Sequence, residues 1–532
     1  MVAIKSLLFL ATAVTALTIG KRDTATILND ISVINSDVQA LTTAANNYNG
    51  GVLAAIPILT AQNNLESAID QGTTSTRALM LCDGKAEVCA SFTHQQSFPN
   101  SGWVEHDPQE LLNNVLACAD ALENADALGL DNQGESCLAW DKKTGEPISS
   151  VIVWQDYRTT NVTERLKAEG HEERVKALSG CPLDPYFSAS KLAWIVEHVS
   201  DAQTLLREKR LILGTTDAFF LQHLVGHCVT DVTTASRTSL MNLETLEWDV
   251  KLCELFGVPL ETLPEILATQ AEFGEVNVKG RKIPLRASVV DQQAALYGHG
   301  CRKPGDAKIT LGTGAFTQAI TGPRPVMNNT DGLLLTVAWL LGDEAPLFAL
   351  DGGVYNAASA VNWARSLGLF SEYHEINSFE KPPAIDQGLI FVPALSGLAC
   401  PHWRREARAG FEGLSLDTEP LDMVQAILEG VALRIAEVIL AMDKSVSIGE
   451  EINVDGGLSN NAYICQFLAD VLGRCIRVTN LPELTAIGCA QLSGVGLKEV
   501  PVSRNNDNIY EPKGKIRHDW IEQFSQSVER TY

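Results

Sequence analysis

Two stretches of the chain share one pattern, in which a short polar turn separates two apolar runs. In the first, Asp70 to Ser75 separates Ala68-Ile69 from an apolar run that starts at Ala78. In the second, Gly312 to Gly314 follows the strand-like run Ala307 to Leu311 and leads into another apolar pair. Apolar runs on both sides of a turn with glycine are typical of β-hairpins. The sequence therefore predicts the same strand–turn–strand unit twice.

Strand-like and helix-like patterns alternate along the rest of the chain body. Asp107 precedes a proline and a helical spacing of leucines, and Val151 to Trp154 is strand-like. Ala287 to Val290 is a short apolar strand, and Val454-Asp455-Gly456-Gly457 is a strand that meets a glycine turn. Asn460-Asn461 follows at the expected start of a helix. Alternation of this kind predicts an α/β fold.

The N-terminal residues have a different pattern. Within residues 1–22, Lys5 precedes the uncharged run Leu7 to Ile19, and Val14-Thr15-Ala16 offers a small-residue cleavage site. This run is too short to span a bilayer and is typical of a secretory signal peptide, with a buried N-terminal helix as the alternative. Residues 23–67 are predicted to be helical, because isoleucines, a valine and a leucine recur there at spacings of three and four.

Composition narrows the class of protein. A chain of 532 residues with 45% hydrophobic and 20% charged residues is long enough for several globular domains. The net charge of −24 argues against nonspecific binding to nucleic acid or to anionic membranes, but leaves a local nucleotide site open. The 12 cysteines include no C-x-x-C pair, which leaves a zinc ribbon unsupported and is typical of reduced cytosolic thiols.

The first turn carries candidate phosphate-binding chemistry. Gly72 lets several backbone N–H groups converge on one anion, and Thr73, Thr74 and Ser75 add hydroxyl donors. Asp70 could hold a hydrated cation. Two such turns could enclose a triphosphate, although each alone is also an ordinary hairpin. No P-loop motif is present, and the second turn lacks the third glycine of a dinucleotide-binding fingerprint.

Asp291 is the candidate general base. It follows the apolar run Ala287 to Val290, so the sequence places its carboxylate at the carboxyl end of a strand. A carboxylate there can accept the proton of a substrate hydroxyl while that oxygen attacks a phosphate. The alternative is that Asp291 only caps a helix that starts at Gln292.

Ten motifs between residues 68 and 500 resemble the FGGY family of carbohydrate kinases, and glycerol kinases in particular. They occur in the order "AIDQGTTSTRAL", "GWVEHDP", "VIVWQDYRT", "LDPYFSASKLAW", "TDVTTASRTSLMN", "VDQQAALYGHG", "GDAKITLGTGAFTQAITG", "VPALSGLACPHW", "AGFEGLSLDTEPLDMVQAILEG" and "VDGGLSNN". The resemblance implies two actin-like (ribonuclease H-like) α/β domains, residues 68–300 and 301–532, with a central cleft between them.

The same resemblance implies an activity and a site. The enzyme would use ATP and Mg²⁺ to phosphorylate a hydroxyl of glycerol or a related small polyol or sugar, with Asp291 as general base and Asp70 at the metal. The positions that match the family's substrate pocket are Glu135, Trp154, Tyr186, Asp291, Gln292 and Phe316. The positions that match its nucleotide site are Thr73, Thr74, Ser75, Arg77, Thr313, Gly457 and Asn461. A homo-oligomer stays an open alternative.

The chain departs from the family pattern at Gly134. The glycerol kinase motif N-Q-R-E is Asn132-Gln133-Gly134-Glu135 here, so glycine replaces the arginine. We expect that the missing guanidinium leaves Glu135 without a neighbouring cation and opens volume in the pocket. A four- or five-carbon polyol or ketose would then compete with glycerol.

A second resemblance covers residues 24–69, which are similar to the start of the fungal hydrophobic surface binding protein A family. The join falls on the strand before Asp70, where Gln62 to Ser67 is more polar than a strand buried on both faces should be. The sequence is thus either a true fusion or an incorrectly joined gene. We expect a cytoplasmic kinase without a transmembrane span. The alternative is a secreted surface-binding protein whose kinase portion is inactive.

Overall fold

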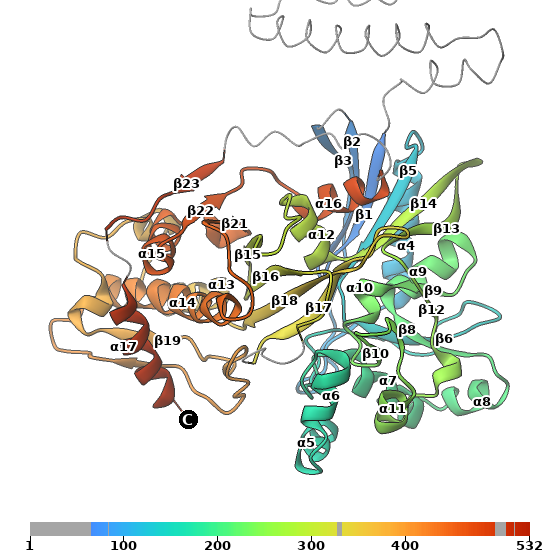
Figure 1. Cartoon of the computed structure of the whole chain (residues 1–532), viewed down its shortest axis with the longest axis horizontal. Coiled ribbons are helices and arrows are strands. Elements are labelled where there is room, and N and C mark those ends of the chain that lie inside the picture. Colours follow the sequence, from blue (N-terminus) through green and yellow to red (C-terminus); the bar gives the residue numbers. More distant parts are fainter. Residues whose placement is uncertain (1–64, 83–84, 327–331, 495–506, 515–516, 532) are drawn as a thin grey trace, which may run out of the picture. The chain divides into compact units, whose positions relative to one another are not determined.

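Two sheets that share a central strand arrangement form the framework of the chain (Figure 1). The computed structural model describes residues 65–82, 85–326, 332–494, 507–514 and 517–531. The predicted signal peptide and the helices predicted before Leu65 lie outside the described residues. The fold below therefore concerns the part of the chain that resembles a kinase.

The first sheet has the strand order β13-β14-β5-β1-β2-β3. Strands β1, β2 and β3 form an antiparallel meander, β5 pairs parallel to β1, and β14 pairs parallel to β5. The predicted hairpin at the Asp70 turn is confirmed, since β1 and β2 flank it. The strands are β1 (Glu66–Gln71), β2 (Ser75–Cys82), β3 (Lys85–Thr93), β5 (Ala127–Asn132), β13 (Gln270–Val278) and β14 (Arg281–Val290).

The second sheet has a similar centre, with the order β17-β18-β16-β15-β21-β22-β23, but β18 rather than the next strand β17 pairs with β16. An antiparallel hairpin again surrounds the turn, and two parallel strands again follow beside the first strand of the hairpin. The predicted second strand–turn–strand unit is therefore confirmed. The strands are β15 (Ala307–Leu311), β16 (Ala315–Gly322), β17 (Leu334–Trp339), β18 (Leu347–Val354), β21 (Glu451–Asp455), β22 (Cys475–Val478) and β23 (Asn508–Tyr510).

Helices cover both faces of the first sheet. On one face, α4 (Pro108–Ala121) and α9 (Thr216–Val225) pack on apolar side chains such as Ile69 and Leu130. Asp107 caps α4, the helix indicated by the pattern after it, because its carboxylate accepts a hydrogen bond from the backbone N–H of Gln109 at 2.8 Å. On the other face lie α12 (Asp291–Gly298) and α16 (Leu484–Ser493), so a helix from late in the chain packs beside β1 (Figure 1).

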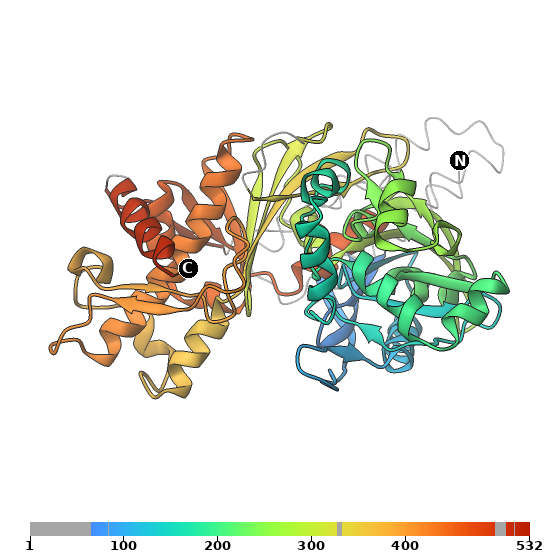
Figure 2. The same ribbon diagram turned by 90° about the horizontal axis from the view of Figure 1, so that it is seen from below.

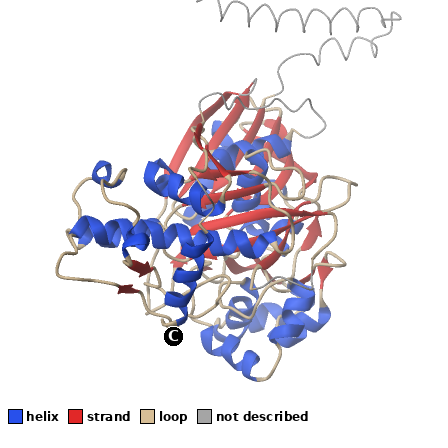
Figure 3. Ribbon diagram, turned by 60° about the vertical axis from the view of Figure 1, so that its left-hand side comes forward, coloured by secondary structure: helices blue, strands red, loops and turns tan. Residues whose placement is uncertain are grey.

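Around the second sheet, the long helix α14 (Pro420–Asp443) packs against α13 (Ala358–Ser366), α15 (Ala462–Leu472) and strands β16 and β18. Helix α17 (His518–Glu529) packs against α14, so the C-terminal end lies beside the orange and red helices in Figure 2. Figure 3 shows the resulting mixture of helices and strands, which confirms the predicted α/β class.

A smaller four-stranded sheet has the order β4-β7-β6-β8 and supports the loops that reach the site. Its elements are β4 (Glu105–His106), β6 (Cys137–Asp141), β7 (Val151–Ile152) and β8 (Leu211–Thr215), with α5 (Thr160–Ala168), α6 (Glu172–Ser179), α7 (Ser188–His198) and α8 (Ala202–Arg207) between them. The remaining elements are β9 (Val229–Asp231), α10 (Val232–Ala235), β10 (Met241–Asn242), β11 (Glu247–Trp248), α11 (Val250–Phe256), η2 (Leu260–Thr262), β12 (Glu265–Leu267), η3 (Tyr373–Ile376), η4 (Ala384–Gln387), β19 (Ile390–Val392), β20 (Gly410–Glu412) and η5 (Gly457–Asn460).

Strand β1 forms although its first residues are polar. It begins at Glu66, is buried throughout and lies between β5 and β2. The Ser67 hydroxyl donates a hydrogen bond to the carbonyl of Ala127 at 2.8 Å, so burying this hydroxyl leaves no unpaired donor. Among the helices that the structure describes, none combines the length and the apolar character that crossing a bilayer requires.

Candidate active site

Three carboxylates gather at the carboxyl ends of three adjacent parallel strands. Asp70 on β1 is the register partner of Asp131 on β5, and Asp131 is the partner of Val289 on β14. Asp291 follows Val289 by two residues. Because side chains alternate between the faces of a strand, the three carboxylates lie toward the same side, the face that α12 and α16 cover. The sequence placed Asp70 and Asp291 in the site but overlooked Asp131.

The pKa of Asp291 is raised to about 7. Burial is the main cause, and the negative charge of Glu135 adds to it, while the Lys308 ammonium opposes the shift. Helix α12 begins at Asp291 itself, and its Oδ1 accepts a hydrogen bond from the Gln292 backbone N–H at 2.6 Å. Asp291 is thus the first residue of the helix and not the cap of a helix that starts at Gln292, because Val290 holds the N-cap position.

Lys308 on β15 brings a buried cation to the site. Its Nζ donates hydrogen bonds to Oε1 of Gln292 at 2.6 Å and to Oγ1 of Thr310 at 2.9 Å. The side chain is fully buried, and burial lowers the pKa of Lys308. A residue of the second sheet thus holds the side chain of Gln292. Sequence reasoning missed Lys308, whose signal was a positive charge inside an otherwise apolar strand.

Three aromatic side chains named from the sequence form one cluster. The ring of Trp154 lies 5.7 Å from that of Tyr186 and 6.1 Å from that of Phe316, with both pairs edge to face. The indole Nε1 of Trp154 donates a hydrogen bond to Oγ1 of Thr73 at 3.1 Å. The aromatic cluster therefore contacts the first turn directly.

Glu135 does not lack a cation, so that expectation was wrong. The guanidinium Nε of Arg237 donates a hydrogen bond to Oε1 of Glu135 at 2.6 Å, and Nη1 lies 2.9 Å from Oδ2 of Asp351. Each of the three side chains is at most 5% exposed. The guanidinium also lies 5.8 Å from the Tyr186 ring centroid. The cation comes from a residue far along the chain, so the local motif around Gly134 could not reveal it.

The backbone at Gly134 leaves room for a Cβ atom. Its φ is +52°, and a Cβ atom built there would meet only Cγ1 of Val290, at an ordinary contact distance of 3.4 Å. Any side chain at this position would hold a left-handed backbone conformation that costs roughly 1–2 kcal/mol.

A cavity of about 530 Å³ in the second half of the chain holds the other predicted nucleotide residues. Thr313, Gly457 and Asn461 line it, together with Tyr373. The Asn461 amide caps α15, since its oxygen accepts from the Ile464 N–H at 2.9 Å and its nitrogen donates to a backbone carbonyl. Asn461 therefore lines the cavity and also caps the helix that the sequence predicted to start there.

The first-turn residues lie outside the lining of this cavity. The Gly72 N–H donates to the carbonyl of Ser75 at 3.0 Å, and the carbonyl of Thr74 accepts from the N–H of His94. Arg77 Nη1 lies 2.9 Å from Oε2 of Glu483 and 3.6 Å from Oδ2 of Asp70. The turn is thus held by its own backbone bonds, and Arg77 links Asp70 to the start of α16.

Comparison with known proteins decides the family. Residues 66–298 match the N-terminal domain, and residues 307–497 the C-terminal domain, of the FGGY family of carbohydrate kinases. The glycerol kinase of Geobacter sp. (strain M21) is 40% identical over 444 residues, which cover 81% of this chain and 89% of that protein. The chain belongs to the FGGY family of carbohydrate kinases.

Other relatives agree with this assignment. The glycerol kinase of Saccharopolyspora erythraea is 38% identical over 450 residues, covering 81% of this chain and 90% of that protein. A crystal structure of Plasmodium falciparum glycerol kinase with ADP matches with a TM-score of 0.80 and 30% identity, covering 88% of this chain and 98% of that one. A xylulose kinase from Lactobacillus acidophilus shares the fold with a TM-score of 0.77, at 21% identity, covering 88% of this chain and 97% of that one.

These matches confirm the predicted fold of two actin-like α/β domains and a carbohydrate kinase that resembles glycerol kinases. The second resemblance is confirmed as well, because residues 24–80 match hydrophobic surface binding protein A. That match overlaps the kinase family over residues 66–80. In the structure these residues form β1 and most of β2, which belong to the first kinase sheet.

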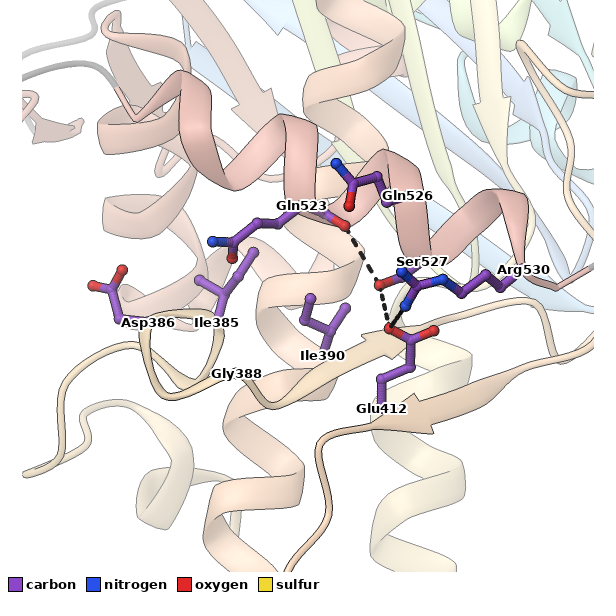
Figure 4. Close-up of a pocket in the computed structure, with 9 residues that line it drawn as sticks. All are labelled: Ile385, Asp386, Gly388, Ile390, Glu412, Gln523, Gln526, Ser527 and Arg530. Carbon is purple, nitrogen blue, oxygen red and sulfur yellow. Dashed lines mark hydrogen bonds and ion pairs between the residues drawn. The ribbon is translucent and has the colours of Figure 1, made fainter.

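A second cavity of this FGGY kinase lies away from the residues discussed above (Figure 4). It has a volume of about 290 Å³ and lies between α17 and the strands β19 and β20. Three of its polar side chains pair with one another, since Glu412 accepts a hydrogen bond from Ser527 at 2.8 Å and from Arg530 at 2.9 Å. It contains none of the residues expected in the active site.

Proposed function

We propose that this kinase transfers the γ-phosphate of ATP to a hydroxyl of glycerol or a related small polyol or ketose. The carrying observation is the environment of Asp291. Its carboxyl follows the carboxyl end of β14, and its pKa is raised to about 7 by burial and by the charge of Glu135, against the effect of the Lys308 ammonium. A base with a pKa near the working pH is what removal of a hydroxyl proton requires. Residues 68–300 and 301–532 are the proposed kinase domains, preceded by the segments 1–22 and 23–67.

In the proposed reaction, Asp291 accepts the proton of the substrate hydroxyl while its oxygen attacks the γ-phosphate, and ADP leaves. Glu135 accepts hydrogen bonds from other hydroxyls, and Gln292 lines the same pocket. Trp154, Tyr186 and Phe316 cover the carbon skeleton. The positive charge of Lys308 offsets the negative charge that collects beside Asp291.

On the nucleotide side, Thr313, Gly457 and Asn461 form the wall against which ATP lies. Thr73, Thr74, Ser75 and Arg77 face the phosphates through the first turn. Asp70 is the proposed Mg²⁺ ligand, since its buried carboxyl fits a dication chemically. Bound Mg²⁺ would neutralise phosphate charge during transfer.

The pH dependence of kcat/KM follows from Asp291. Its pKa in the folded enzyme is raised to about 7, and only the ionised form acts as base. We expect kcat/KM to fall about tenfold per pH unit below pH 7 and to level off above it. Because the Lys308 ammonium lowers the Asp291 pKa, Lys308→Met should move this limb to higher pH. If kcat/KM instead falls only below pH 4–5 in both proteins, the group responsible is an ordinary carboxyl and not Asp291.

A substrate panel tests the acceptor. Glycerol, dihydroxyacetone, erythritol, arabinitol and xylulose are compared with ATP and Mg²⁺ by kcat/KM. Since glycine replaces the arginine at Gly134, we expect kcat/KM for a four- or five-carbon acceptor to come within about tenfold of that for glycerol or to exceed it. A factor of about ten is the effect of one or two hydroxyl hydrogen bonds. Gly134→Arg should shift preference toward glycerol, whereas Gly134→Ala carries the same backbone strain and should shift it less.

The panel also has a contradicting result. If the parent prefers glycerol by more than about a hundredfold, the space at Gly134 does not set specificity. If neither Gly134 variant differs from the parent in preference, the residue has no part in acceptor choice.

We place the kinase portion in the cytoplasm, where ATP is available. The 12 cysteines all lie within the described residues and none of them forms a disulfide there, which suits a reducing compartment. N-terminal sequencing of the native protein shows whether residues 1–67 are present in the mature chain, and secreted, glycosylated material would contradict this placement. The alternative of a secreted binding protein with an inactive kinase portion is not favoured, since Asp70, Asp291 and both glycine turns are present in the chain.

A further inference from the structure

Asp131 is a buried acid for which the proposed reaction has no use so far. It is fully buried on β5, and neither carboxylate oxygen makes a hydrogen bond with the described residues. The side chains that face it are the carboxyls of Asp70 and Asp291 and the thiol of Cys489 on α16, which is only a weak donor. Its neighbours therefore add negative charge and do not balance the charge of the Asp131 carboxylate.

The two flanking carboxylates differ from Asp131 in this respect. Asp70 has the Arg77 guanidinium 3.6 Å away, and the Lys308 ammonium acts on Asp291. Burying a carboxyl without a hydrogen bond, next to a second carboxyl, destabilises a fold. An unpartnered polar group of this kind calls for a ligand that the polypeptide itself does not contain.

We propose that Asp131 is a second protein ligand, beside Asp70, of the divalent cation that binds with the nucleotide phosphates. This inference rests on the proposed kinase function and adds a residue to its metal site. Mg²⁺ is commonly held by one or two carboxylates together with substrate phosphates and water. The described residues contain no group of three or more His, Cys, Asp or Glu side chains that could hold a metal alone. A metal site with two carboxylate ligands, completed by nucleotide phosphates, agrees with the ligands that Mg²⁺ prefers and with the absence of a larger group from the described residues.

A competing explanation is that Asp131 is a neutral acid that donates a hydrogen bond to Asp70. Asparagine separates the two explanations, because it has the same shape, keeps an N–H donor and carries no charge. If Asp131 only donates a hydrogen bond, the Asp131→Asn protein still binds the cation. If Asp131 is a metal ligand, the Asp131→Asn protein loses cation affinity.

The experiment measures Mn²⁺ affinity of the full-length protein by electron paramagnetic resonance, with a non-hydrolysable ATP analogue present. We expect Asp131→Asn to weaken Mn²⁺ binding by at least about tenfold, since even outer-shell partners of metal sites are worth about 10- to 100-fold. Affinity for the metal-free analogue should not change. The control is Asp120→Asn on α4, which removes the same charge from an exposed position on the opposite face of the sheet.

A thermal melting curve recorded without metal shows whether the Asp131→Asn protein is folded. Removing an unpaired buried charge should leave the melting temperature unchanged or raise it by about 1–4 °C. Asp131→Cys gives a second, positive test, because a thiolate favours soft metals. This variant should lose Mn²⁺ but bind Cd²⁺ more tightly than the parent and than Asp131→Ser.

The outcomes are distinguishable. Parent binding with Asp131→Asn within twofold of it overturns the ligand role of Asp131 and leaves the kinase proposal standing. A parent that binds no Mn²⁺ with the nucleotide analogue overturns both. Weakened Mn²⁺ binding in Asp131→Asn, with Cd²⁺ binding restored in Asp131→Cys, supports the proposal.

Discussion

Replacing Asp291 by asparagine is expected to lower kcat by about 10²–10⁴-fold and to leave ATP affinity near that of the parent. The amide cannot accept the hydroxyl proton, but its oxygen can still accept the Gln292 N–H that Asp291 now accepts at 2.6 Å. Helix α12 should therefore keep its first turn. Steady-state turnover and calorimetric binding of an ATP analogue measure the two quantities separately.

Asp120→Asn is the matched control, because it removes the same charge from an exposed site and should turn over like the parent. The pH limb at about 7 should also disappear in Asp291→Asn, since the group responsible is gone. A purified Asp291→Asn protein that turns over within a few-fold of the parent would end the general-base assignment.

The second large effect is expected at Arg237. Arg237→Met leaves Glu135 and Asp351 buried without their shared cation, and breaking a buried ion pair in this way costs about 3–5 kcal/mol. We expect a clear loss of thermal stability together with a raised KM for the acceptor, because Glu135 is no longer held in place. Thermal melting and steady-state kinetics record both.

Arg530→Met provides the comparison. Arg530 lies 2.9 Å from Glu412, the same separation as between Arg237 and Asp351, but its side chain is 64% exposed. An exposed pair of this kind contributes about 0–1 kcal/mol. Adding Asp351→Asn to Arg237→Met should recover part of the lost stability, since one orphaned charge is removed. Equal losses in Arg237→Met and Arg530→Met would show that burial of the triad does not matter.

The features that the sequence predicted correctly depend on residues close together in the chain. The glycine turns at Gly72 and Gly312 predicted both hairpins, because turn chemistry is encoded within a few residues. Asp107 and Asn461 cap helices as their positions indicated, since a cap depends only on the next turn of chain. The position of Asp291 after an apolar strand was likewise readable from its neighbours.

The contacts that the sequence missed join residues far apart in the chain. Arg237 meets Glu135 across 102 positions and lies against Asp351 of the second sheet. Lys308 reaches Gln292 from another sheet, and α16 packs on β1 although it follows the last parallel strand of the second sheet. No local pattern reports such pairings, so the charge balance at Glu135 could be corrected only from the structure.

Transfer of phosphate to a polyol is the central claim, and product analysis of the full-length protein tests it most directly. The protein is incubated with ATP, Mg²⁺ and each acceptor in turn, and phosphorus NMR follows ATP, ADP and new phosphate esters. The account predicts that a phosphomonoester of a small polyol or ketose forms in equal amount to ADP, and that Asp291→Asn forms neither at a comparable rate. ADP without an ester, or ATP binding without turnover for every acceptor, would contradict it.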